Sequence, residues 1–200
     1  MTIVQILFAF TLLLVYFSLH SILAADRIKA WFSSFMGSYF RYYRLIYNIL
    51  STLLLFLLLG WMTGFPKHLL FETNAWTKGA AMLFLVPGAW LFLSALWQYQ
   101  MGEFLGTQQL KGKDTVSAAD GLKTTGINAL VRHPLYLGTI LFLFGLFLFY
   151  PQISSLVFLI SVLLYLPFGI HFEEKKLRRQ FGQAYLDYEK QVKRLIPGVW

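Results

Sequence analysis

The sequence predicts an all-α integral membrane protein with about five transmembrane helices and a cytoplasmic amphipathic helix at its carboxyl end. Of the 200 residues, 58% are hydrophobic and only 13% are charged, whereas soluble domains carry roughly 25% charged residues. Apolar runs of spanning length recur along the chain, and 20 Phe, 11 Tyr and 6 Trp supply side chains for the bilayer interfaces. The chain has no cysteine, which excludes disulfides, a thiolate nucleophile and a zinc–thiolate site.

Five apolar runs are the expected spanning helices, because a bilayer core needs about 20 apolar residues. The first run has almost no basic residues before it, so we expect a retained helix rather than a cleaved leader. The fourth run reaches only about 24 Å at about 1.5 Å per residue, which is short for a full span. The link between the last two runs leaves room only for a tight helical hairpin. The runs are residues 3–23, 43–62, 80–99, 135–150 and 152–171.

The basic residues predict the orientation of the chain. Of the 17 Lys and Arg residues, 15 lie in residues 24–44, in residues 101–134 or after His171, and only Lys67 and Lys78 fall on the other side. The positive-inside rule places the amino terminus outside and the carboxyl terminus in the cytoplasm of an inner membrane. Because this topology accounts for the net charge of +8, we do not expect nucleic acid as a partner.

The tail after His171 has the pattern of a helix. Apolar residues recur there at helical spacings, and polar residues occupy the opposite face. We expect this helix to lie on the bilayer surface or to cap a site, and to end at Pro197 and Gly198. The apolar positions are Leu177, Phe181, Tyr185, Tyr188 and Val192.

The most informative stretch is residues 124–138, where Arg132, His133 and Tyr136 lie between a polar loop and an apolar run. Pro134 suits the first position of a helix, since its missing N–H costs nothing there. Gly126 and the amides of the first turn can offer backbone donors to a ligand. About forty residues later, Glu173 and Glu174 follow another apolar run, on the same predicted side of the membrane. The polar loop over residues 108–125 is a further candidate for ligand contacts.

Each of these features also has a plainer interpretation. Arg132 and His133 can anchor a helix in the lipid headgroups, and Glu174 can pair with Arg178 on a solvated helix. Arg41 and Arg44 are typical of a positive-inside flank, and Asn48 of a hydrogen bond between membrane helices. His20, a polar residue at membrane depth, is a weak indication of function.

The order of the motifs changes this balance. From residue 120 to 197 the chain resembles the isoprenylcysteine carboxyl methyltransferase and phospholipid methyltransferase superfamily, in its Gly-Ile-Asn, Arg-His-Pro-Leu-Tyr-Leu-Gly and Glu-Glu motifs and in Phe181 to Tyr188 and Pro197. Residues 20–24, 41–48 and 102–110 resemble the NnrU-like and methanethiol S-methyltransferase branch. The resemblance implies one membrane domain over residues 1–200, with three helices in 1–100 and a cofactor-binding loop, hairpin and terminal helix in 101–200.

The resemblance also implies S-adenosylmethionine as cofactor. Glu173 has the charge to hold the cofactor's ammonium group, and Tyr136 can face its adenine or sulfonium. We assign Arg132 and His133 as catalytic, expect no metal, and give substrate contacts to His20, Arg41, Arg44, Asn48 and Glu174. The cofactor contacts implied by the resemblance are Leu122, Lys123, Gly126, Ile127, Asn128, His133, Pro134, Leu135, Tyr136 and Glu173.

Two departures from the superfamily pattern bear on the substrate. Asn128 stands where a tyrosine is expected, and Gly169 stands where an arginine is thought to hold a substrate carboxylate. We therefore expect a small or lipophilic acceptor drawn from among membrane lipids or small molecules, such as a thiol like methanethiol or a lipid amine. Isoprenylcysteine-type carboxyl or phospholipid N-methylation is an alternative. A non-enzymatic accessory membrane protein is another, and it should tolerate loss of Glu173 and His133 but not of His20.

Overall fold

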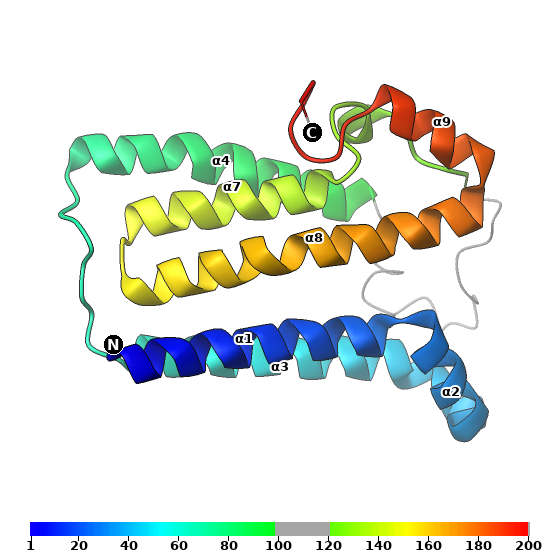
Figure 1. The fold of residues 1–200 in the computed structure, drawn as a ribbon, viewed down its shortest axis with the longest axis horizontal. Coiled ribbons are helices and arrows are strands. Elements are labelled where there is room, and N and C mark those ends of the chain that lie inside the picture. Colours follow the sequence, from blue (N-terminus) through cyan, green and yellow to red (C-terminus); the bar gives the residue numbers. More distant parts are fainter. Residues whose placement is uncertain (99–120, 200) are drawn as a thin grey trace. The chain divides into compact units, whose positions relative to one another are not determined.

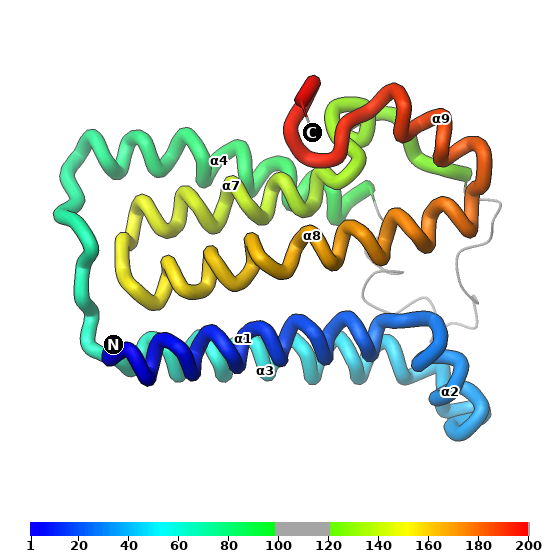
Figure 2. The backbone as a smooth tube through the Cα atoms, viewed as in Figure 1, coloured from blue at the N-terminus to red at the C-terminus, as the bar shows by residue number. Residues whose placement is uncertain are grey.

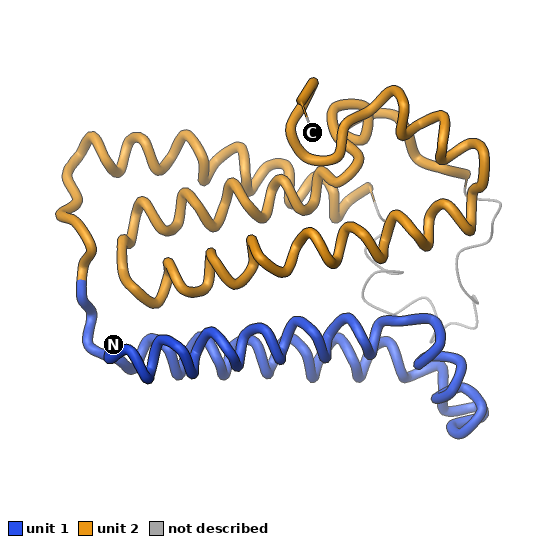
Figure 3. The backbone as a smooth tube through the Cα atoms, in the orientation of Figure 1, with its two compact units in different colours: residues 1–68, 99–117 blue, residues 69–98, 118–200 orange. Residues whose placement is uncertain are grey.

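The computed structural model describes residues 1–98 and 121–199, and within those ranges every long element is a helix (Figure 1). An isolated antiparallel bridge between Leu69 and Gln152 is the β-type pairing recorded there. The chain divides into two compact units, which Figure 3 colours separately: unit 1 contains Met1–His68, and unit 2 contains Leu69–Gln98 and residues 121–199. The prediction of an all-α protein is confirmed. The prediction of one domain over the whole chain stays a prediction.

Unit 1 is built on α1 (Ile3–Ala24) and α3 (Tyr43–Thr63), which run side by side (Figure 2). Three hydroxyl groups join them: Tyr16 Oη donates to Ser51 O at 3.1 Å, Tyr47 Oη to His20 O at 2.8 Å, and Tyr43 Oη to Leu23 O at 2.9 Å. As the residue numbers rise along α1 they fall along α3, so the helices are antiparallel. Polar atoms between membrane helices satisfy one another in this way because lipid offers them no partner.

Between these helices the chain is helical where the sequence analysis expected a loop. α2 (Asp26–Met36) starts two residues after α1 ends, and η1 (Gly37–Tyr42) leads directly into α3. Gly37, the first residue of η1, ends α2 with φ of 53°, a conformation that favours glycine because it has no Cβ. The sequence signal for α2 is an apolar stripe that is shorter than a membrane span.

Unit 2 contains α4 (Ala75–Gln98) and α7 (Pro134–Phe149), whose backbones approach closely at glycines. A Cβ added at Gly88 would lie 2.4 Å from the Phe142 nitrogen, and one added at Gly138 would lie 2.6 Å from the Phe92 nitrogen. At Gly145 the added atom would lie 2.7 Å from the Leu85 nitrogen. Small residues at a helix contact permit dispersion contacts between backbones, which is how membrane helices associate in lipid.

The hairpin of α7 and α8 (Ile153–Phe181) turns as the sequence predicts. Pro134 is the first residue of α7, as expected, and α7 has only 16 residues. α8 has 29 residues, about 43 Å at about 1.5 Å per residue, against a hydrocarbon core of about 30 Å. Its polar last turns, from Glu173 onward, therefore extend beyond the length needed to span.

The carboxyl-terminal region differs from the expected helix over residues 177–192. Residues 177–181 continue α8, Gly182 with φ of 54° ends that helix, and α9 is confined to Gln183–Gln191. From Val192 to Pro197 the chain is not helical, because the carbonyl groups of Lys193 and Arg194 accept hydrogen bonds from the backbone N–H groups of Arg132 and His133. The amphipathic helix therefore exists, but it is shorter than the pattern suggests.

The described residues contain four helices long and apolar enough to span a membrane, in Ile3–Ala24, Asp26–Thr63, Ala75–Gln98 and Ile153–Phe181, with Pro134–Phe149 as a shorter apolar helix. Of these, Asp26–Thr63 includes α2 and η1 before α3. Exposed aliphatic and aromatic side chains cover these helices, as expected for surfaces that face lipid. The chain is a multi-pass membrane protein, and its predicted orientation stays a prediction.

Candidate functional site

The residues before α7 form the centre of the candidate site. His133 caps the helix, and its side chain is only 3% exposed. The backbone N–H groups of Arg132 and His133 donate to the carbonyl groups of Lys193 and Arg194 at 2.8 and 3.1 Å. The segment that follows α9 is thereby fixed beside the start of α7, and its backbone satisfies two amides that the helix itself cannot use.

Glu174 lies at the centre of a buried group of charges, and its side chain is 3% exposed. Arg132 Nη2 donates to Glu174 Oε1 at 2.6 Å, and Arg194 Nη2 lies 2.9 Å from Oε2. His133 Nε2 is 3.3 Å from Oε1, and Arg178 Nη2 is 3.7 Å from Oε2, which confirms the predicted pairing along α8. Charge-assisted hydrogen bonds of this kind are strong in a site that excludes water. Glu174 is therefore fully engaged in holding the surrounding segments.

Arg132 reaches the last turn of α9 as well. Its Nη1 donates to Glu189 O at 3.0 Å and to Val192 O at 3.3 Å, and its side chain is 7% exposed. Glu189 in turn accepts two hydrogen bonds from Arg178, at 3.0 and 2.8 Å. Arg132 thus holds the end of α9 and the start of the terminal segment beside the start of α7. The catalytic role assigned to it from the sequence stays a prediction.

Glu173 differs from its neighbour, because its side chain is 36% exposed. His133 Nδ1 lies 3.6 Å from Glu173 Oε2, and Tyr136 hydrogen bonds to the same carboxylate. The rings of His133 and Tyr136 stack with centroids 5.5 Å apart. Of the two glutamates, Glu173 has the more exposed side chain.

The charge of His133 is set by two opposing effects. Burial lowers the pKa of His133, whereas hydrogen bonds and charge interactions with Glu173 and Glu174 raise it, and together they raise the pKa above its ordinary value. His133 therefore holds its proton more tightly than a free imidazole, with Nε2 3.3 Å from Glu174 Oε1 and Nδ1 3.6 Å from Glu173 Oε2.

The segment preceding Arg132 is attached to the end of α4. Lys123 Nζ donates to Gln98 O at 2.7 Å, and Gln98 Nε2 donates to Thr125 O at 3.1 Å. Asn128, in η2 (Gly126–Ala129), donates from Nδ2 to Lys123 O at 2.9 Å and accepts at its backbone carbonyl from Tyr188 Oη at 2.6 Å. Its Oδ1 is buried and has no hydrogen-bond partner among the described residues. A buried acceptor of this kind is available to a ligand's N–H or O–H group.

Of the cofactor contacts implied by the resemblance, Leu122 and Leu135 are half-buried, as is Ile127 beside the positive-φ glycine Gly126. Pro134 is buried and locks the start of α7. All the predicted cofactor residues therefore belong to unit 2, on the segment before α7, its first turn and α8. Most of the predicted loop over residues 108–125 lies outside the described residues.

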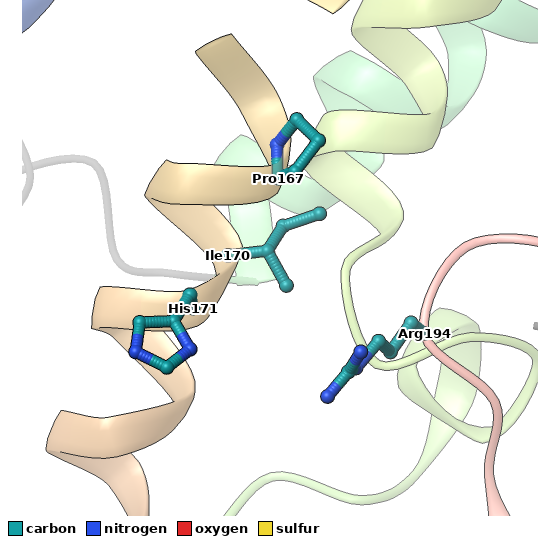
Figure 4. Close-up of a pocket in the computed structure, with 4 residues that line it drawn as sticks. All are labelled: Pro167, Ile170, His171 and Arg194. Carbon is teal, nitrogen blue, oxygen red and sulfur yellow. The ribbon is translucent and has the colours of Figure 1, made fainter. Parts of the chain in front are cut away.

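A small cavity of about 170 Å³ lies between α8 and the terminal segment (Figure 4). It is lined by Pro167, Ile170, His171 and Arg194. Because Arg194 is already bound to Glu174, its charge is largely compensated at this wall. Cavities of about 150 Å³ accommodate benzene, so this one has room for a small molecule.

The substrate contacts predicted from residues 1–68 lie in unit 1. His20 Nδ1 is 2.8 Å from Tyr47 Oη, Arg41 donates to Tyr42 Oη at 2.9 Å, and Arg44 and Asn48 are half-buried on α3. Their part in binding a substrate stays a prediction. Glu174, also predicted to contact substrate, is enclosed by the buried charges described above.

Sequence reasoning missed Arg194, Glu189 and Tyr188 as supports of the site. Tyr188 appeared as an apolar position of a helix and as the last residue of the Phe181 to Tyr188 motif, and Arg194 was counted only among the basic residues after His171, so neither was expected to support the site. No local pattern marks them, since each meets its partner through the reversal of the chain at Gly182.

Fold and site together define a class: a multi-pass α-helical membrane protein with a polar site where a short apolar helix begins. Residues 8–198 match the NnrU protein family, and the chain belongs to that family. It is 27% identical over 194 residues to methanethiol S-methyltransferase 2 of Bradyrhizobium diazoefficiens, covering 89% of this chain and 68% of that protein. It is 26% identical over 182 residues to methanethiol S-methyltransferase of a Pseudomonas species, with the same two coverages. It is 28% identical over 185 residues to methanethiol S-methyltransferase 1 of Bradyrhizobium diazoefficiens, covering 89% of this chain and 62% of that protein.

No solved structure is significantly similar to this chain. The resemblance to the NnrU-like and methanethiol S-methyltransferase branch is confirmed by the family match and by these relatives.

Proposed function

We propose that this protein is an integral-membrane methyltransferase that uses S-adenosylmethionine and methylates a small thiol. The observation that carries the proposal is the difference in exposure between the side chains of two adjacent glutamates, Glu173 and Glu174. The Glu174 side chain is 3% exposed and contacts three arginines and His133, whereas the Glu173 side chain is 36% exposed and lies beside Tyr136. The relatives named methanethiol S-methyltransferase point to the same activity.

The chain's residues suit the chemical groups of the cofactor. The Glu173 carboxylate can accept charge-assisted hydrogen bonds from an ammonium group. The ring of Tyr136 offers an aromatic face to a cation or an adenine. The buried Oδ1 of Asn128 has no partner among the described residues and can accept from an amino or hydroxyl group. These groups lie on the segment before α7, on α7 and on α8.

The methyl group would come from the sulfonium of S-adenosylmethionine, so the protein need not supply a nucleophile of its own. The acceptor thiol would release its proton to solvent, and its sulfur would bond to the methyl carbon as the bond to the sulfonium sulfur breaks, which leaves the neutral thioether S-adenosylhomocysteine. Holding the two sulfur atoms in line around the methyl group supplies most of the rate. Excluding water also favours a reaction in which opposite charges cancel.

Gly169 supports a small acceptor without a carboxylate. A Cβ placed there would lie 3.7 Å from Tyr165 Cε1 and 4.0 Å from Tyr136 Oη. This position, one turn before Glu173, therefore presents neutral aromatic side chains rather than a cation.

Calorimetry with S-adenosylmethionine on the protein in detergent tests the cofactor. Glu173→Gln should weaken binding roughly 10- to 100-fold, because a hydrogen bond to a charged group is worth about 1.5–3 kcal/mol. The matched control is Glu72→Gln, an exposed glutamate three residues before α4, which should bind as the wild type does. A folded wild type that binds no S-adenosylmethionine would overturn the proposal and favour a non-enzymatic accessory role.

The acceptor is tested by supplying methanethiol and S-adenosylmethionine and measuring dimethyl sulfide by gas chromatography. A prenylated cysteine and a phosphatidylethanolamine should accept no methyl group under the same conditions. Methylation of either one in preference to methanethiol would refute the thiol assignment while leaving the methyltransferase activity in place.

A further inference from the structure

We propose that α2 lies in the plane of the membrane and docks on the lipid interface. Its apolar side chains would enter the boundary between headgroups and acyl chains, and its basic side chains would contact lipid phosphates. The α2 apolar face is defined here as Ile28, Trp31, Phe32 and Phe35. This surface is independent of the proposed methyl transfer.

The sequence of α2 segregates on the helix surface. The four residues of the α2 apolar face follow one another at spacings of three, one and three, which places them within a stripe roughly 100° wide. Ala30, Ser33 and Ser34 lie on the opposite side. An 11-residue helix is about 16 Å long, which is too short to span a bilayer. Only one side of α2 is apolar, so only that side needs apolar surroundings.

Unit 1 covers only part of the α2 apolar face. Phe32 packs against Tyr43 with ring centroids 4.9 Å apart, and Ile28 is half-buried. Trp31 and Phe35 stack on each other and are 62% and 82% exposed. α2 has no buried residue at all within the described part of the chain. Two large aromatic side chains in water would be unfavourable, whereas amphipathic aromatic rings are stabilised at a bilayer interface.

The connections of α2 place a bilayer surface beside it. One residue, Ala25, separates it from the spanning helix α1, and η1 joins it directly to the spanning helix α3. Figure 1 shows α2 turned away from the direction that α1 and α3 share. With both ends tied to spanning helices, α2 cannot leave the level at which those helices emerge from the hydrocarbon core. Lipid is therefore the occupant that its position favours over a protein partner.

The charged residues of α2 flank its apolar face as this arrangement requires. Arg27 and Lys29 stand one residue before and after Ile28, roughly 100° to either side of it. Long basic side chains at the edges of an apolar stripe extend toward lipid phosphates while their methylene groups stay on apolar surface. Lys29 Nζ also lies 3.6 Å from Asp26 Oδ1 on the first turn. Both side chains are partly exposed, so Lys29 can contact a lipid phosphate in place of Asp26.

Spin labelling of the full chain in vesicles tests the proposal, and the absence of native cysteine allows each label a unique position. Trp31→Cys and Phe35→Cys probe the apolar face, and Ala30→Cys and Ser33→Cys probe the polar one. Each labelled variant is placed in vesicles of phosphatidylcholine with phosphatidylglycerol. Collision of the label with oxygen, which enters lipid, is compared with collision with a water-soluble nickel chelate. Leu57→Cys on α3 gives the lipid reference and Lys190→Cys gives the aqueous reference.

We expect the oxygen-to-nickel collision ratio to be severalfold higher at positions 31 and 35 than at 30 and 33, approaching the lipid reference. Equal aqueous exposure at all four positions would overturn the proposal, because α2 would then stand in water. Strong immobilisation or dipolar broadening at 31 and 35 would also overturn it, since a second copy or another protein would then cover the face. Two positions on each face guard against one substitution disturbing the helix.

Discussion

Glu174→Gln is the change that most directly tests how the site is held together. Glutamine keeps the shape of the side chain but removes the charge that neutralises Arg132 and Arg194, whose nitrogens lie 2.6 and 2.9 Å from the carboxylate. The residues involved belong to three separate parts of the chain: the start of α7, the last turns of α8 and the terminal segment that follows α9. We therefore expect the terminal segment to loosen as well as the whole unit to lose stability.

The size of the effect follows from burial. Removing one partner of a buried ion pair costs about 3–5 kcal/mol. The Arg132 side chain is 7% exposed but keeps the carbonyls of Glu189 and Val192 as acceptors, and Arg194 is 37% exposed. These compensations place the expected loss near the low end, about 3 kcal/mol. For a chain of this length that corresponds to a fall in the unfolding midpoint of about 6–12 °C.

The assay is thermal unfolding in detergent, followed by tryptophan fluorescence, with trypsin cleavage after Lys193 or Arg194 as a local readout. Asp187→Asn is the control, because Asp187 pairs with Lys190 at 2.8 Å on an exposed face; it should leave the midpoint unchanged. The reasoning is refuted if Glu174→Gln lowers the midpoint no more than the control does. Cleavage at the terminal segment should also become faster in Glu174→Gln well below the midpoint.

Three further changes can be read in the same assay. Gly88→Ala should lower the free energy of unfolding by about 1–3 kcal/mol, because the added Cβ meets the backbone of α7. Gly79→Ala on the same helix is the control and should be neutral, because nothing lies within 4 Å of its added Cβ. Equal effects of the two substitutions would contradict the close packing of α4 on α7. Tyr188→Phe removes a buried hydrogen bond and should cost about 1–3 kcal/mol, whereas Tyr185→Phe removes a buried hydroxyl without a partner among the described residues and should cost nothing. His133, whose pKa is raised, stabilises the fold fully below the ordinary pKa of about 6.5 and loses this effect as pH rises through the raised value. The midpoint difference between wild type and His133→Asn should therefore shrink as the pH rises above about 6.5; a constant difference would argue against a charged His133.

The sequence by itself determined the class of fold and the five long apolar helices. The apolar runs appear as α1, α3, α4, α7 and α8, since a run of about 20 apolar residues can satisfy its backbone in lipid only as a helix. Pro134 begins α7 because the local cost of proline vanishes at that position. The apolar runs and the helix start at Pro134 depend on residues that are neighbours in the sequence, so they can be predicted from the sequence alone.

Only the tertiary structure decided which of the two glutamates is buried: the Glu174 side chain is 3% exposed and the Glu173 side chain 36%. Glu173 and Glu174 are adjacent on α8, and a helix turns successive side chains by roughly 100°, so a single step separates an accessible carboxylate from an enclosed one. Which side is enclosed depends on Arg132, 42 positions away, and on Arg194, brought back by the reversal at Gly182. Likewise the terminal segment is not helical because its carbonyls serve the start of α7. Contacts between distant segments depend on how the hairpin and the tail pack, and no local pattern in the sequence encodes that register.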